Sequence, residues 1–488
     1  MKFISTIILC FFLTISIAQE AETFTIEQII ELAQSESPQV KLAELKQSNA
    51  YWNNQSFLAN YRPQIDLGIT LPSLNRSVGQ IDLPDGTSDF IARSFMTNSI
   101  SLSLSQNVTA TGGSVYAAAN LSRLDVFKTD NNPSQVTYRS NPLIFGFNQP
   151  LFGFNQLKWD KRIMPLEYEE AQARFSEEME ATAMLSVGRF FELLIAQLNL
   201  KSALSRKVVA DDLYQLGQNR FSVGNIAETD LLQLEMDVMR SNTDISRAKL
   251  AKQTANEELR NFLGILESVD FQLDLPLDIP DITVDMELAL LHARSNRSTI
   301  MALQIRLLEA EQFRERSKAN AGISGSLTGE IGLTGLGSGF SDAYSTLLDQ
   351  QIVSLRLNIP IADWGKSKAS HEIAKSNYDL VNLNVGLEKV NFENAVRISV
   401  QQFELIKENV NLSKRSYEAS QKRYDLTRKR YVIGKVDVTQ LNLADIEQEG
   451  QRRSYIQSIN DFWQKYYEIR SLTLYDFING KSLVETNN

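Results

Sequence analysis

The sequence predicts an α+β membrane protein in which a helix–strand–strand–helix unit occurs twice. Three observations support this prediction: one turn sequence is repeated at a fixed spacing, short stretches alternate apolar and polar residues, and two helical patterns run for about 60 residues each. Alternation with a period of two is typical of a strand that has one apolar and one polar face. The chain of 488 residues is long enough for roughly two to four domains.

The repeated turn reads YQLGQNRFSVGNIAETDL at 214–231 and YDLTRKRYVIGKVDVTQL at 424–441, an offset of 210 positions. The identical pairs are Tyr214/Tyr424, Leu216/Leu426, Arg220/Arg430, Gly224/Gly434, Thr229/Thr439 and Leu231/Leu441. Each shared glycine tolerates the left-handed conformation that ends a helix. Each copy therefore predicts the tip of a hairpin of two long antiparallel helices, and two copies in register indicate a duplicated unit.

The helix that follows each glycine has a predicted start. Asn225 with Glu228, and Asp437 with Gln440, have the three-residue spacing of a capping box. We therefore expect a capped helix to begin directly after both turns.

The first 18 residues have the pattern of a secretory signal peptide. Lys2 precedes a short apolar run that ends in small residues, which places cleavage between Ala18 and Gln19. A transmembrane anchor is the alternative, but the run is short and acidic residues follow it. Cys10 is the only cysteine and lies inside this run, so the mature chain is expected to have no thiol, disulfide or cysteine metal site.

Composition limits the classes of partner. Cleavage removes Lys2 from the 49 basic residues and removes none of the 59 acidic ones, so the net charge changes from −10 to −11. This acidity argues against a nucleic-acid partner, because a basic patch is the usual footprint of nucleic-acid binding. No run of about 18 apolar residues follows Ala18, so no membrane-spanning helix is expected. The remaining choices are a soluble secreted protein and a β-barrel.

Two alternating stretches in each half predict strands, at about 64–72 and 139–149 and again at 326–334 and 351–360. Between the two strands of the unit, the offset that aligns the halves falls from 260 to 210. The first half thus has about 50 extra residues.

Those extra residues contain a loop-like stretch, with prolines and serines, at 72–95. They also contain two candidate strands, at 97–108 and 113–125, joined by a tight Thr-Gly-Gly turn. We interpret the insertion as one additional hairpin or an enlarged outer loop, in the membrane or outside it.

The predicted organisation is as follows: signal peptide 1–18; first repeat 19–265, with helices at about 25–62, 158–219 and 226–264; acidic proline-containing linker 266–285; second repeat 286–479, with helices at about 286–319, 366–429 and 437–476; flexible tail 480–488. The first helix is expected to break at Ser37-Pro38. Apolar residues in the two longest helices follow coiled-coil-like 3-4 spacing. At 1.5 Å per residue, each would span on the order of 90 Å, more than a globular domain needs.

The strands lead to a prediction about assembly. An apolar face on strands of a secreted chain suits lipid, but an open sheet edge in lipid is not viable and single-chain barrels have at least about eight strands. Two strands in each half give four per chain, or six with the additional hairpin. Four strands from each of three copies would close a trimeric barrel of twelve, and the helical hairpins would continue it as a ring of twelve helices. An ordinary β-sandwich is the alternative, but it leaves the long helices unexplained.

These features resemble the TolC family of outer-membrane efflux proteins. The resemblance rests on the duplicated unit, the strand exits QPLFGFN (149–155) and IPIADWG (359–365), and both R-[FY]-x-x-G-x-[IV]-x-x-T turns, and it covers nearly all of the mature chain. It implies a homotrimeric channel-tunnel with its barrel in outer-membrane lipid and a coiled-coil tube in the periplasm. It also implies docking to a periplasmic adaptor (membrane fusion protein) and to an inner-membrane efflux pump or ABC transporter.

The resemblance places the turns at the periplasmic entrance. The residues implied in adaptor contact are Arg220, Phe221, Gly224, Arg430, Tyr431 and Gly434; packing of the turns alone is the alternative. Some family members hold the entrance shut with an Arg and Asp residues after the second glycine, but this chain has Val436, Gln440 and Leu443 there. The candidates for a polar ring at the mouth are Glu228, Asp230, Asp437 and Gln440, which also fit plain solvated helix starts.

Aromatic residues follow the ends of the predicted strands. Phe152, Phe154, Trp159 and Trp364 fit an aromatic belt at the membrane surface or packing of the barrel-to-tube junction. Neither catalysis nor a cofactor is expected, because there is no phosphate-loop pattern and the two histidines stand alone. The aspartates of the linker fit solvent better than a calcium site.

The sequence therefore favours a passive outer-membrane exit duct of a tripartite efflux or type I secretion system. The alternative is a secreted coiled-coil scaffold or periplasmic adaptor without a pore. Strand pairs with lipid-suited faces in both halves favour the duct.

Overall fold

The computed structural model describes residues 23–82, 84, 86–128, 133–276 and 279–484. The predicted cleavage site at Ala18 and Gln19 lies outside the described residues. The chain divides into two compact units. A strand unit comprises residues 45–174 and 297–393, and a helical unit comprises the remaining segments up to 44, 175–296 and 394 onward.

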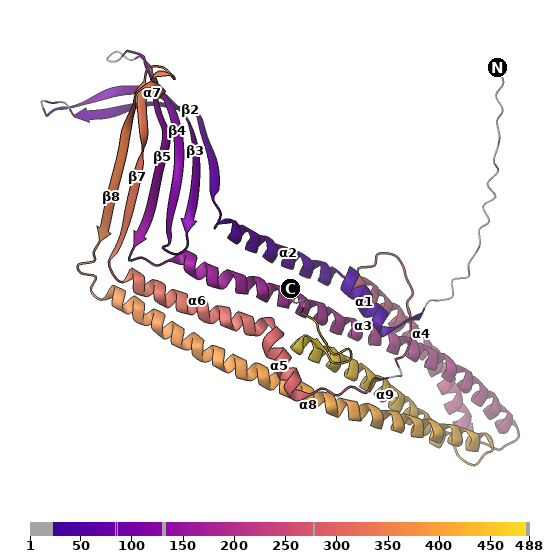
Figure 1. The fold of residues 1–488 in the computed structure, drawn as a ribbon. Helices are drawn as coiled ribbons and strands as arrows, with labels where there is room; N and C mark the ends of the chain where they lie inside the picture. Colours follow the sequence, from indigo (N-terminus) through magenta and orange to yellow (C-terminus); the bar gives the residue numbers. More distant parts are fainter. Residues whose placement is uncertain (1–22, 83, 85, 129–132, 277–278, 485–488) are drawn as a thin grey trace, which may run out of the picture. The chain divides into compact units, whose positions relative to one another are not determined.

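A single antiparallel sheet dominates the strand unit (Figure 1). Its strands, in spatial order, are β2 (Gln64–Asp82), β3 (Ser88–Val108), β4 (Gly113–Val126), β5 (Gln135–Leu151), β7 (Ser324–Gly337) and β8 (Leu347–Asn358). The sheet therefore has six strands, the count that includes the additional hairpin, rather than the four used for the twelve-stranded closure. The hairpin β3–β4 pairs on both sides, with β2 and with β5, as part of the same sheet.

One face of the sheet is apolar across its width. Directly paired residues share a face, and the pairings place Ile65, Leu104, Ala117, Phe145 and Ile331 in one row across five strands. The larger side chains of this row are exposed to 42–71% in the single chain. Exposed apolar surface on this scale marks a face that is covered in the working protein, by lipid or by another protein.

The stretch 72–95, predicted as a loop, is mostly strand. Ser73–Asp82 pairs residue for residue with Ser88–Thr97, which extends β2 and β3 into a long hairpin. A register shift between Thr70 and Ser73 explains the missed prediction. Such a bulge inserts a residue and changes the phase of the apolar alternation, so the period of two is lost from the sequence.

Four helices connect to this sheet: α2 (Pro38–Ala59), α3 (Gln156–Ser222), α6 (Ser298–Asn320) and α8 (Lys366–Val432). α3 and α8 have 67 residues each and contribute residues to both units. Helix α3 contains an 18-residue window apolar enough to cross a membrane by length and composition, and half of it is buried. Such burial is typical of a packed core helix, which carries apolar residues around its whole circumference.

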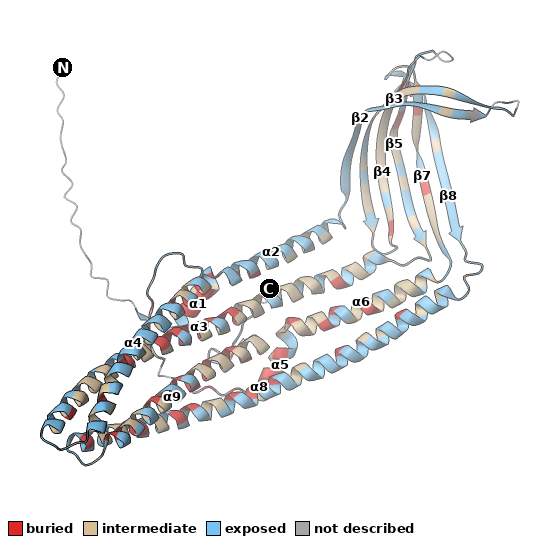
Figure 2. Cartoon of the chain, turned by 180° about the vertical axis from the view of Figure 1, so that it is seen from behind, coloured by how far each residue is buried: buried red, intermediate tan, exposed pale blue. Residues whose placement is uncertain are grey.

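The helical unit adds α1 (Ile26–Glu36), α4 (Glu228–Leu263), α5 (Met286–Asn296) and α9 (Val438–Thr473) to parts of α2, α3 and α8. Its buried aromatic core comprises Phe190, Phe191, Phe271, Phe403, Phe462 and Tyr466. Figure 2 colours buried residues of the helical unit red, among them stretches of α3, α5 and α9. Large aromatic side chains supply much of the apolar area that holds such a bundle together.

The helix predicted at 286–319 is broken, which corrects that prediction. Arg297 is extended (φ −78°, ψ 129°) between α5 and α6, as Ser37 is between α1 and α2. The offset of 260 maps one break onto the other. The first break was visible because a proline follows Ser37, whereas Ser298 follows the second and gives no such signal.

Short strand pairs occur in the linker and in the described part of the tail. Within 266–285, β6 (Gln272–Leu273) pairs in parallel with β1 (Thr23–Phe24), and Phe271 is buried against Phe24. The predicted flexible tail contains β10 (Lys481–Ser482), which pairs with β9 (Tyr475–Asp476). Gly480 has φ +64°, and its left-handed conformation turns the chain back to form this pair.

Candidate functional site at the paired helical turns

Both repeated turns end their helices with the same hydrogen-bond motif. The amide of Asn225 donates to Arg220 O (2.8 Å) and that of Lys435 donates to Arg430 O (2.9 Å). A second bond runs from each glycine amide to the carbonyl of the residue after the arginine, at 2.9 Å in both turns. These are the two bonds of a Schellman motif, which requires a left-handed residue. Gly224 (φ +76°) and Gly434 (φ +75°) supply it.

The two arginines of the repeat have different surroundings. The Arg220 guanidinium donates to the main-chain carbonyls of Val432 (2.8 Å) and Tyr431 (3.3 Å), and it lies 5.5 Å from the centre of the Tyr431 ring. Arg220 thus joins the end of α3 to the end of α8. Arg430, its counterpart in the repeat, is exposed. The duplicated sequence therefore gives one bridging arginine and one solvent-facing arginine.

The aromatic residues of the repeat also differ. Tyr431 is 5% exposed and packs in a small core with Leu234, Val438 and Leu441. Phe221, at the matching position, is 42% exposed. Burial raises the pKa of Tyr431, while the charge of Arg220 opposes that rise. The tyrosine side chain therefore stays neutral and serves as a packing element.

The four candidate ring residues are all exposed: Glu228, Asp230, Asp437 and Gln440. Asp437 caps α9, because its carboxylate accepts from the main-chain amide of Gln440 at 2.8 Å.

The capping box predicted for Asn225 is wrong: α4 begins at Glu228, and its N-cap is Ala227, which has no side-chain bond. The offset of 210 aligns Ala227 with Asp437, so only the second copy of the repeat has a side-chain cap at this position. Glu228 and Asp230 remain in the first turn of α4, where carboxylates interact favourably with the helix dipole.

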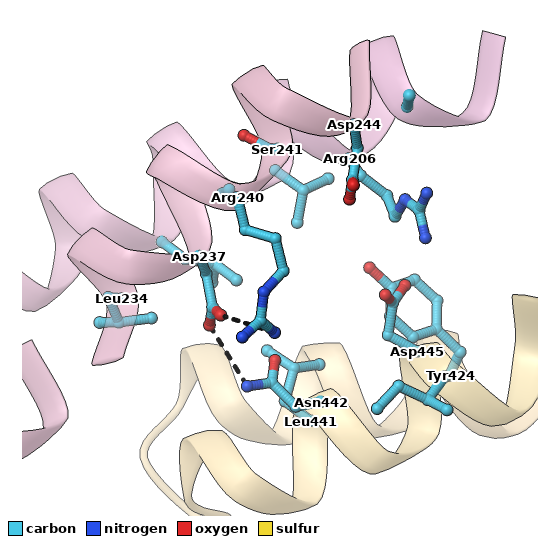
Figure 3. A pocket seen from close by; sticks show the side chains of 15 residues that line it. Arg206, Leu234, Asp237, Arg240, Ser241, Asp244, Tyr424, Leu441, Asn442 and Asp445 are labelled. Atoms are coloured by element: carbon cyan, nitrogen blue, oxygen red, sulfur yellow. Dashed lines mark hydrogen bonds and ion pairs between the residues drawn. The ribbon is translucent and has the colours of Figure 1, made fainter. Parts of the chain in front are cut away.

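A polar pocket of about 270 Å³ lies behind the turns, between α3, α4, α8 and α9 (Figure 3). Asp237 on α4 accepts from the Asn442 amide on α9 (3.3 Å), and its other oxygen lies 4.0 Å from Arg240. On the other side of the pocket, burial raises the pKa of Asp445, while the charge of Arg206 counteracts the rise. The pocket thus contains one polar link between the two helical hairpins, Asp237–Asn442.

Sequence reasoning missed this pocket, because its residues come from four helices and share no motif. The available signal was weak: Asp237 and Asp445 interrupt apolar positions on helices predicted to face neighbours. Among the described residues, no group of three or more His, Cys, Asp or Glu side chains is placed to hold a metal ion.

The four aromatic residues at the strand exits divide into two pairs. Phe154 and Trp159 stack on each other (6.4 Å between ring centres), and arginines lie against both rings. Phe152 and Trp364 are 69% and 98% exposed. The first pair therefore packs at the junction of β5 and α3, and the second is free to meet an interface.

Comparison with known proteins identifies the family. The chain matches the model of the family described as outer membrane efflux protein over residues 29–265 and 292–473. A search of curated proteins gives no significant match.

Among solved structures, the CmeC outer membrane channel of Campylobacter jejuni is similar, with a TM-score of 0.65 and 15% identity, over 94% of this chain and 87% of that one. The outer-membrane channel OprN is similar too (TM-score 0.65, 17% identity, 93% and 90% covered). So is the open-state MtrE outer membrane channel of Neisseria gonorrhoeae (TM-score 0.61, 13% identity, 92% and 88% covered). At sequence identities this low, the structural similarity shows the fold alone, which is an α+β fold with long helices and antiparallel strands.

The family model covers both repeats and most of the chain, which confirms the predicted resemblance and favours the channel over a pore-free scaffold or adaptor. The chain belongs to the outer membrane efflux protein family, the TolC family of non-enzymatic outer-membrane efflux channels.

Proposed function

We propose that three copies of the chain form a passive exit duct, with a closed β-barrel in the outer membrane and a coiled-coil tunnel in the periplasm. The observation that carries the proposal is the apolar face of the sheet, which is exposed from β2 to β8 in the single chain. A sheet with such a face and two free edges is unsuited to lipid until further strands pair with its edges. The proposed mature chain begins at Gln19.

Two measurements test the duct. Detergent-extracted protein is expected to migrate as a trimer that heating converts to a monomer. The same trimer is expected to give discrete single-channel currents in planar bilayers. Release of a soluble monomer by osmotic shock would overturn the proposal.

We propose further that the paired turns form the periplasmic mouth and contact an adaptor that links the duct to an inner-membrane pump or ABC transporter. Apolar side chains support this: Phe221, Val223, Val432 and Ile433 are exposed to 42–68% at the turns. Apolar groups clustered at the end of a helical hairpin, ringed by charge, are suited to binding another protein. Cysteines at Val223 and Ile433 should crosslink to a periplasmic adaptor in intact cells, whereas a cysteine at exposed Leu250, on α4, should not.

The two turns are proposed to do unequal work in closing this mouth. Arg220 bridges α3 to the last residues of α8, whereas Arg430 makes no such bridge and is exposed. The Asp237–Asn442 bond also links the hairpins close to the turns. Opening that separates the hairpins at the turns would break both of these contacts, and neither uses the residues of the ionic lock found in some family members.

A further inference from the structure

The hairpin β3–β4 extends to the end of the sheet where the strands join the helices. Its turn, residues 109–112, is held by side chains from the end of β5 and from the connection between β5 and α3. Asn155 Nδ2 donates to Thr109 O (2.9 Å) and Ala110 O (3.4 Å), and Gln149 Nε2 donates to Thr111 O (3.0 Å). A hairpin that formed only an outer loop would not need to extend to the end of the sheet where the helices begin. The added hairpin therefore has the same extent as the strands beside it.

The hairpin also has the same two faces as its neighbours. Leu102 and Leu104 on β3 pair with Ala119 and Ala117 on β4, within the apolar face. The alternate residues of β3 are Ser99, Ser101, Ser103 and Ser105, on the opposite face. Alternation of large apolar and small polar residues is the pattern of a barrel wall between lipid and water.

On the polar face, the hairpin is joined to the second repeat across an intervening strand. The Tyr116 hydroxyl on β4 donates to Glu330 Oε2 on β7 at 3.0 Å, passing over Gly146 of β5. A Cβ at Gly146 would lie 2.3 Å from the Tyr116 ring, so glycine is required beneath the tyrosine. The added strand β4 is thus fastened into the sheet by its side chains as well as by its main chain.

The free edges of the sheet suit pairing with identical copies. The edge strands are β2 and β8. Every neighbouring pair in the sheet is antiparallel, so with six strands β2 and β8 run in opposite directions. β2 of one copy can therefore pair in the antiparallel sense with β8 of the next.

From these observations we infer that the barrel closes with eighteen strands, six from each of three copies, rather than with twelve. The inference rests on the trimer proposed above. Barrel diameter grows roughly in proportion to strand number, so at equal tilt the wall is about 1.5 times as wide as that of a twelve-stranded barrel. Barrels of about 16–18 strands leave an aqueous channel. The serines of β3 add only small side chains to the polar face that would line this channel.

Cysteine substitutions test whether β3 lies in the barrel wall. The only native cysteine, Cys10, lies in the predicted signal peptide, so introduced thiols are the only ones in the mature chain. Ser101→Cys and Ser103→Cys should react with a charged, membrane-impermeant thiosulfonate and reduce the single-channel current. Leu102→Cys should react only with a lipid-soluble maleimide. The matched control on β8 is Ser354→Cys against Val353→Cys, on the polar and apolar faces of a strand that both strand counts include.

The outcomes separate the two proposals. Alternating reactivity on β3 that matches the pattern on β8 supports eighteen strands. If cysteines at residues 101–103 all react equally with the impermeant reagent, while the reactivity on β8 still alternates, the inference of eighteen strands is overturned. The proposal of a duct is unaffected by that result. Absence of any current from the unmodified protein overturns the duct itself.

A direct count is independent of the variants. Electron cryomicroscopy of the trimer in lipid nanodiscs should resolve eighteen strands in cross-section. Twelve strands, with β3 and β4 outside the wall, would overturn the inference. A number of copies other than three, each contributing six strands, would overturn both the trimer and the count of eighteen.

Discussion

At the scale of single residues, Arg470 joins three elements inside the helical unit. Its guanidinium contacts Glu180 on α3 through two nitrogens at 2.9 Å and lies 3.4 Å from Asp476 on β9. Burial raises the pKa of Glu180 even though Arg470 opposes the rise, and burial raises the pKa of neighbouring Tyr467 to about 12. A buried carboxylate of this kind depends on its partner to stay charged.

Arg470→Met should therefore cost about 3–5 kcal/mol of unfolding free energy, because it leaves Glu180 buried without its cation. The double variant Glu180→Gln/Arg470→Met removes both charges and should recover most of the loss. Denaturant unfolding of the purified protein, followed by circular dichroism, measures both. A double variant as unstable as Arg470→Met would show that the pair is not the cause.

Asp445 and Glu449, one helical turn apart on α9, have pKa shifts of opposite sign. Burial raises the pKa of Asp445. Burial alone would raise that of Glu449 as well, but a hydrogen bond from Ser202 (2.8 Å) and the charge of Arg452 lower it. Ionised Asp445 thus costs stability above its unfolded pKa, whereas ionised Glu449 contributes stability above its unfolded pKa and loses it as pH falls through its folded value.

Asp445→Asn should raise the melting temperature at pH 7, because it removes a poorly solvated charge, and Glu449→Gln should lower it. The Asp445→Asn difference should shrink as the pH falls and wild-type Asp445 becomes protonated, whereas the Glu449→Gln difference should persist to lower pH, because the folded pKa of Glu449 is depressed. Melting curves at several pH values from 8 down to about 3 test this. Shifts of the same sign for the two variants at pH 7 would contradict it.

The unequal arginines give a prediction about the closed mouth. Arg220→Ala removes the bridge to the α8 carbonyls and should increase the conductance of the closed channel in planar bilayers. Arg430→Ala, the matched change in the other copy, should leave it near the wild-type value. Equal increases from both variants would show that the two turns contribute equally.

At the scale of elements, the glycine turns could be predicted because only a left-handed residue ends a helix in this way. The start of α4 could not, because Asn225 has the spacing of a cap while the helix begins three residues later. The full length of β2 and β3 could not be predicted, because the alternation of apolar and polar residues changes phase at the bulge near Pro72. The Asp237–Asn442 contact depends on how two hairpins pack, and no local pattern encodes that packing.

Two glycines with open space around them should respond oppositely to alanine. Gly434 has φ +75°, so Gly434→Ala should destabilise the turn by about 1–2 kcal/mol through backbone strain. Gly386 lies inside α8 with no atom near its missing side chain, so Gly386→Ala should stabilise the helix by about 0.5–1 kcal/mol. Hydrogen exchange of the α8 amides measures both. Faster hydrogen exchange of the α8 amides in the Gly386→Ala variant than in the wild-type protein would contradict the prediction.

At the scale of the whole molecule, alternation predicted the sheet and its apolar face, since a strand with one apolar and one polar face alternates with a period of two. The number of strands was harder to obtain, because the inserted residues fit a hairpin inside or outside the wall equally well. Only the pairing of β3 and β4 with strands on both sides decides that they belong to one sheet.

The face assignment can be tested on β8, where Arg356 already lies on the polar face and Leu355 on the apolar one. Leu355→Arg should destabilise the inserted state by about 2–4 kcal/mol near the bilayer centre. Ser354→Arg, the control on the Arg356 face, should still assemble. Heat-modifiable migration of membrane extracts compares the two. Normal assembly of Leu355→Arg would reverse the assigned faces.

The tight turn between β3 and β4 has a consequence for how such ducts change size. A hairpin inserted between β2 and β5 adds two strands per chain and leaves both sheet edges, with their directions, unaltered. Neither end of this hairpin is attached to a helix, since β3 follows β2 and β4 leads into β5. In the proposed duct, the bore of the barrel can therefore be enlarged in steps of two strands per copy, while the connections of the helices stay unchanged.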